Sequence, residues 1–162
     1  MAYFKKELAK RQAGEGGRRG LFVPYDQLTD RVGPLSREDP KSLGIVLVEN
    51  PWKAARRPYH KQKLALILAN LRHFALEQAD RGVAVRHVVG DGPYASALEP
   101  LIPELGPLRA MKPAERELRA DLEKLVSRGS LQFIPHEGWL STSEQFRESD
   151  AKGLSWKMDT FY

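Results

Sequence analysis

Two carboxylates, each close behind an apolar run, are the first candidates for chemistry in this sequence. Asp26 comes shortly after Leu21-Phe22-Val23, and Glu49 ends the most apolar run, residues 43–48. Such runs predict buried strands, and α/β proteins bind ligands in the loops that follow parallel strands. A carboxylate there can accept hydrogen bonds from a small heterocyclic ligand. Each can equally cap a helix or pair with Arg56 or Arg57, and both alternatives stay open.

A basic and aromatic elbow follows Glu49 and leads into the longest predicted helix. Five cations fall within residues 53–63, with Trp52 directly before them and Tyr59 among them. This mixture suits a phosphate-bearing or aromatic ligand, or single-stranded nucleic acid. It also suits a solvated helix start, although cations there oppose the helix dipole. The candidate binding residues are Tyr25, Asp26, Gln27, Glu49, Asn50, Trp52, Lys53, Tyr59, His60 and Glu115.

Three enzymatic templates do not fit, so we predict no catalytic residue and no metal ligand in this chain. The glycine-rich segment 14–17 precedes the first strand and cannot cradle a phosphate at a helix N-terminus. No Gly-x-Ser-x-Gly nucleophile turn is present. The sequence has no cysteine, and no two of its four histidines have the i,i+4 spacing that places two ligands on one helix face.

The elements that must position these residues alternate between strand and helix. We expect strands at 21–23, 43–48, 83–89, 108–111 and 131–134, and main helices at 60–81, 94–101 and from Pro113 to Gly129. We also expect a short helix at 3–12 with Phe4 and Leu8 on one side, and a helical turn near 143–147. Alternation at this spacing predicts a parallel sheet covered on both faces.

The expected fold is therefore α/β: a three-layer Rossmann-like or flavodoxin-like domain with a five-stranded parallel sheet of order 3-2-1-4-5. That order places the topological switch between the first and fourth strands. Residues 25–27 and 112–115 should then face each other across a crevice, with the elbow above them.

Charge is unevenly distributed along the chain. Of its 162 residues, which carry a net charge of +5, the first 19 hold six basic and two acidic side chains. We expect residues 1–19 to form a flexible basic arm and 20–162 the domain. The arm and the elbow together make nucleic-acid binding one hypothesis. No apolar run approaches the roughly 20 residues of a membrane helix, so we expect a cytoplasmic protein.

Several separated segments resemble the deoxyribodipyrimidine photolyase-related proteins, the iron–sulfur bacterial branch of the cryptochrome/photolyase family. The resemblance spans about residues 20–162, and its strongest part is Arg-Arg-Pro-Tyr-His-Lys-Gln-Lys-Leu at 56–64. The other segments are Val-Pro-Tyr-Asp-Gln-Leu at 23–28, Leu-Arg-His-Phe-Ala at 71–75, Lys-Pro-Ala-Glu at 112–115 and Trp-Lys-Met-Asp-Thr-Phe-Tyr at 156–162.

This resemblance implies an N-terminal antenna domain that holds an accessory chromophore, a ribityl-lumazine in characterised members. The chromophore passes excitation to FAD. The resemblance places the FAD, the iron–sulfur cluster and the surface for damaged DNA in a C-terminal helical domain that would begin after Tyr162. That domain is the expected partner, light-dependent repair of UV-damaged DNA is the expected task of the whole protein, and this chain alone is not expected to catalyse it.

Two positions depart from the family pattern. Tyr25 stands where the family's first strand commonly runs into Gly-Asp-Gln-Leu, and Lys53 matches a glutamate that contacts the chromophore in lumazine-binding members. A donor in place of an acceptor disfavours the same ring in the same pose. The alternative to an antenna domain is thus a ligand-free structural or interaction module of the same fold.

Overall fold

The computed structural model describes the chain except residues 1, 12, 15, 57–59, 140 and 150–162. It contains one sheet of five parallel strands in the order β3-β2-β1-β4-β5, which confirms the predicted topology. The strands are β1 (Arg19–Phe22), β2 (Leu43–Glu49), β3 (Ala84–Val89), β4 (Leu108–Met111) and β5 (Leu131–Ile134). Within the described residues, no helix is long and apolar enough to cross a membrane.

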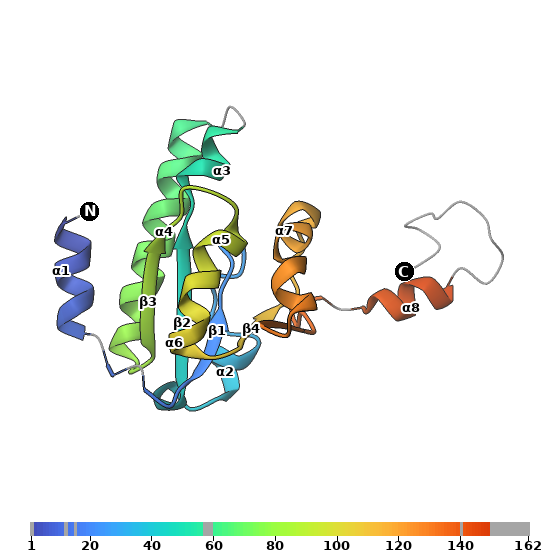
Figure 1. The fold of residues 1–162 in the computed structure, drawn as a ribbon, viewed down its shortest axis with the longest axis horizontal. Coiled ribbons are helices and arrows are strands. Elements are labelled where there is room, and N and C mark those ends of the chain that lie inside the picture. The colour runs from blue at the N-terminus through green and yellow to red at the C-terminus, as the bar shows by residue number, and fades with distance from the viewer. Residues whose placement is uncertain (1, 12, 15, 57–59, 140, 150–162) are drawn as a thin grey trace.

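The alternation of side chains along β2 divides the core into two clusters. Leu43, Ile45 and Leu47 pack in the cluster that includes Leu71 and Phe74 of α4 (Lys61–Asp80). Val46 and Val48 pack in the other cluster, with α5 (Tyr94–Leu98) and α7 (Arg116–Ser127). Both faces of the sheet are therefore covered, as Figure 1 shows, and the three-layer prediction is confirmed.

The remaining helices are short. They are α1 (Ala2–Arg11), α2 (Pro34–Arg37), η1 (Pro40–Ser42), α3 (Pro51–Ala55), η2 (Glu99–Leu101), α6 (Ile102–Leu105) and α8 (Ser143–Ser149). Gly82, with φ 90°, follows the end of α4 in the left-handed conformation typical of a glycine that ends a helix. The prediction that Pro113 opens a helix is wrong: α7 begins at Arg116, and Arg119 instead donates to the carbonyls of Pro113 and Ala114.

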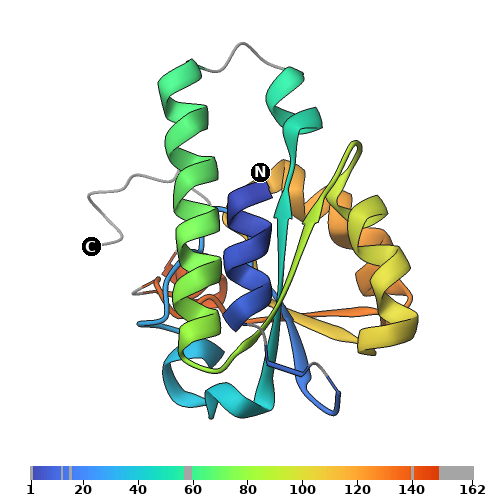
Figure 2. The same ribbon diagram turned by 90° about the vertical axis from the view of Figure 1, so that its left-hand side faces the viewer.

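The N-terminal segment differs from the expected flexible arm. Its predicted helix is present as α1, which lies beside α4 on one face of the sheet (Figure 2). Phe4 and Leu8 are buried in the core cluster, and Arg11 pairs with Asp80 of α4 at 2.9 Å. Residues 2–11 are thus packed, because an amphipathic helix gains hydrophobic free energy by covering the apolar edge of the core.

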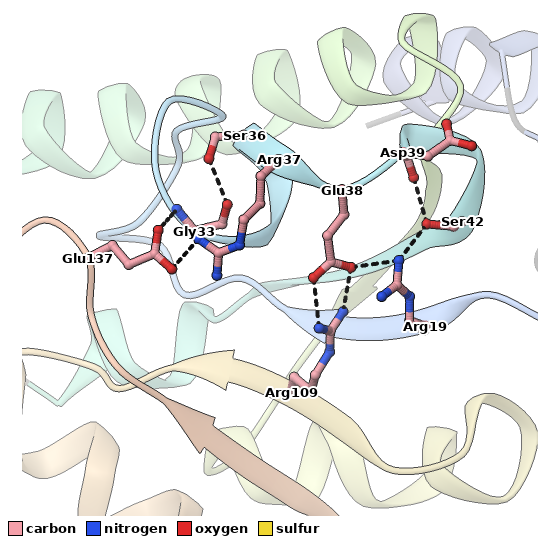
Figure 3. A network of polar contacts seen from close by, with 9 residues as sticks. All are labelled: Arg19, Gly33, Ser36, Arg37, Glu38, Asp39, Ser42, Arg109 and Glu137. Carbon is pink, nitrogen blue, oxygen red and sulfur yellow. Dashed lines mark hydrogen bonds and ion pairs between the residues drawn. The ribbon is translucent and has the colours of Figure 1, made fainter.

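The connection from β1 to β2 is held by a polar network (Figure 3). Glu38 accepts two hydrogen bonds from Arg109 of β4, at 2.9 and 3.1 Å, and pairs with Arg19 of β1 at 3.0 Å. Glu137, after β5, pairs with Arg37 and accepts from the Gly33 backbone amide at 2.9 Å. These bonds fix the connection without a long helix.

Candidate functional site

Three side chains from three elements meet at the topological switch. Tyr25 follows β1, Lys53 lies in α3 after β2, and Glu115 precedes α7 after β4. The Tyr25 hydroxyl donates to Glu115 Oε2 at 3.1 Å, and the Lys53 ammonium forms an ion pair with the same oxygen. Lys53 Nζ also lies 3.4 Å from the Tyr25 hydroxyl. We call Tyr25, Lys53 and Glu115 the switch-point cluster; it confirms that the two predicted walls of the crevice face each other.

Two aromatic rings lie close to the Lys53 ammonium. Its nitrogen lies 4.7 Å from the centroid of the Tyr25 ring and 5.9 Å from that of Tyr94, within the range of cation–π attraction. Tyr94 is buried, and burial raises the pKa of its phenol, so it remains protonated at neutral pH. Tyr94 was not among the predicted site residues because it begins α5, a helix expected only to cover the sheet.

The two residues after Tyr25 have different surroundings. Asp26 is exposed, yet desolvation by nearby protein atoms, followed by the charge of Glu115, raises the pKa of its carboxyl. Gln27 is buried and donates from its amide nitrogen to the Met111 carbonyl at 3.2 Å. Gln27 therefore ties the end of β1 to β4, while Asp26 faces solvent beside the switch-point cluster.

Glu49 and Asn50 do not join that cluster. Asn50 caps α3 by accepting from the Lys53 amide at 2.9 Å, and donates to the Gly92 carbonyl at 3.0 Å. Glu49 accepts from Arg72 of α4 at 3.0 and 2.5 Å and lies 3.1 Å from His87 Nε2 of β3. Of the open alternatives for Glu49, pairing with an arginine is the one seen, but the partner is Arg72.

Glu49, Arg72 and His87 form what we call the enclosed cluster. Burial opposes ionisation of Glu49, but the hydrogen bonds and charge of Arg72 outweigh it and lower the pKa of the carboxyl. The His87 side chain is only 3% exposed, and its burial lowers the pKa of the imidazole. Its ring packs edge-on against Phe4, with the two ring centroids 4.9 Å apart. The alternation of side chains along β2 indicates that Glu49 is covered by α4, because Glu49 lies on the same face of the strand as Ile45 and Leu47.

The elbow is only partly described. The guanidinium of Arg56 lies 4.8 Å from the centroid of the Trp52 ring. His60 stands at the N-cap of α4, exposed and without a side-chain capping bond. Tyr59, Arg57 and Pro58 lie outside the described residues. The structure thus brings Tyr25, Lys53 and Glu115 together, with Asp26 beside them, and leaves Glu49, Trp52 and His60 apart.

Known proteins can now be compared with this chain. Residues 21–162 match the family described as deoxyribodipyrimidine photo-lyase-related protein. The chain belongs to this family. It is also 30% identical over 151 residues to a (6-4) photolyase of Agrobacterium fabrum (strain C58 / ATCC 33970). That alignment covers 88% of this chain and 30% of the photolyase, so the chain spans less than a third of that relative.

Membership of the photolyase-related family raises the question whether the crevice suits a lumazine-type chromophore. The Tyr25 hydroxyl and the Lys53 ammonium both bind Glu115 Oε2, so these side chains join the two predicted walls, and a ring between the walls would have to separate them. The residues present therefore do not fit that group in this arrangement. No cluster of three metal-ligating side chains occurs among the described residues.

Proposed function

We propose that this chain is the N-terminal α/β domain of a photolyase-like flavoprotein that acts in light-dependent repair of UV-damaged DNA. We further propose that it serves there as a ligand-free support module. Its family and its similarity to a (6-4) photolyase support the first statement. In this proposal the flavin, the iron–sulfur cluster and the lesion-binding surface belong to a helical C-terminal partner domain, and the chain alone does not catalyse repair.

The observation that carries the support role is the switch-point cluster. Lys53 and Glu115 are 18% and 24% exposed, so their ion pair is partly shielded from water. A ring entering the crevice would have to separate these charges and displace the Tyr25 phenol. Separating this partly exposed pair costs about 1 kcal/mol or less, and a ligand would have to offset that cost together with the displacement of the phenol.

The competing proposal is an antenna domain, and Asp26 favours it. This carboxyl stands at the carboxyl end of β1 beside the switch, and its raised pKa places it among the perturbed groups typical of binding sites. Rotation of Tyr25 and Lys53 away from Glu115 would open the crevice next to it. The two proposals therefore differ in whether the cluster opens for a ligand.

A titration with ribityl-lumazine separates the two proposals. We expect the purified chain to be colourless in the near-ultraviolet and blue, and to give no saturable change in lumazine fluorescence. The double variant Tyr25→Gly/Lys53→Glu removes the ring and places a like charge beside Glu115, so it should gain lumazine binding. The matched variant Tyr25→Gly/Lys63→Glu, which keeps Lys53, should not. Stoichiometric uptake by the unaltered chain would overturn the support role in favour of the antenna role.

A further inference from the structure

The two helical layers of the domain differ in charge. The layer of α1 and α4 carries seven basic and three acidic side chains, a net charge of +4. The opposite layer, α5 to α7 with η2, carries three basic and five acidic side chains, a net charge of −2. Both helices belong to one layer, since α1 lies alongside α4 on the same face of the sheet (Figure 2).

Four lysines of the positive layer are available to an outside partner. Lys5, Lys6, Lys61 and Lys63 are exposed, and none of them forms an ion pair within the described part of the chain. In the opposite layer, by contrast, Lys124 and Arg128 both pair with Glu99. Exposed lysines spread along two helices suit an extended polyanion such as a phosphate backbone.

We propose that the α1–α4 face binds the phosphate backbone of undamaged duplex DNA without reading its sequence. Lysine ammonium groups act as point charges toward phosphates and carry no base specificity. This inference rests on the proposed function, because a protein that repairs DNA meets duplex DNA as its polyanion. Its role would be to hold the duplex beside the partner domain.

The test is binding of a fluorescein-labelled, lesion-free duplex in the dark, followed by anisotropy as salt rises from about 50 to about 200 mM. Each neutralised phosphate contributes about 0.9 to the slope of log affinity against log salt. Four lysine contacts then predict a roughly 100-fold loss of affinity over this range. The variant Lys5→Glu/Lys6→Glu should bind more weakly at low salt and lose only roughly 10-fold.

A variant of equal net charge is the control. Lys124→Glu/Arg128→Glu makes the same charge change on the opposite layer and should bind DNA as the unaltered chain does. New acids in the first turns of α1 favour its dipole, so α1 should stay folded, which circular dichroism checks. Absent DNA binding, salt-independent binding or an equal loss in both variants would overturn this inference. Because the DNA carries no lesion and no lumazine is added, this result is independent of whether the crevice takes a chromophore.

Discussion

Two ion-paired clusters adjoin the carboxyl end of β2, and they differ in how far water reaches them. In the switch-point cluster, the side chains of Lys53 and Glu115 are 18% and 24% exposed. In the enclosed cluster, those of Glu49 and His87 are 7% and 3% exposed, while the Arg72 side chain reaches the surface and is 30% exposed. The protein thus keeps one charged group beneath α1 and another at the mouth of the crevice.

The difference in exposure gives the two clusters different roles. Charges near water exchange partners at little cost, because solvent replaces what a lost partner supplied. Charges removed from water depend on their partners, since an unpaired ion in the interior is strongly disfavoured. The enclosed cluster should therefore hold α4 to the sheet, while the switch-point cluster is the place where a substitution can change ligand binding.

The largest effect is expected from Glu49→Ala. This variant leaves Arg72 and His87 without their shared carboxylate under Phe4, and should lower the free energy of unfolding by about 3 kcal/mol. Urea denaturation followed by circular dichroism measures it. Glu77→Ala is the control. Glu77 lies on α4 and its side chain is 56% exposed, so this variant should change the free energy of unfolding by less than about 0.5 kcal/mol. Equal losses of unfolding free energy in the two variants would show that the burial of Glu49 does not set its contribution to stability.

The contacts of the enclosed cluster could not be predicted from the sequence, whereas most of the fold could. Strand order, both layers and the facing of residues 25–27 with 112–115 were predictable, because apolar runs and helix spacing are local and the switch follows from topology. The partners of Glu49 were not, since Arg72 and His87 lie 23 and 38 positions away and are chosen by the register of β2 and β3 and by the docking of α4. Tyr94 was missed for the same reason.

A smaller effect is expected from pH, again in the enclosed cluster. The pKa of His87 is lowered on folding, so the unfolded chain binds a proton near pH 6.5 that the folded chain does not, and stability falls as pH drops below that value. The lowered pKa of Glu49 adds a loss at more acid pH, below its unfolded value near 4.5. His87→Gln should reduce the loss of unfolding free energy between pH 7 and 5.

His73→Gln is the control for that experiment. His73 is 75% exposed on α4, so its replacement removes one imidazole from the surface and leaves the enclosed cluster intact. An unaltered pH profile in His87→Gln would mean that the imidazole is not held neutral by burial, and would remove the distinction between the two clusters.

The smallest effect is expected at the crevice. Lys53→Met keeps the aliphatic stem over Tyr25 but removes the charge from Glu115, and should lower the free energy of unfolding by about 1 kcal/mol or less. Because this pair is within reach of solvent ions, the difference between Lys53→Met and the unaltered chain should shrink in 1 M salt, where the screening length is about 3 Å. The effect of Glu49→Ala should persist under the same conditions. If salt reduced both effects alike, water and ions would have equal access to the two clusters, and the distinction between them would fail.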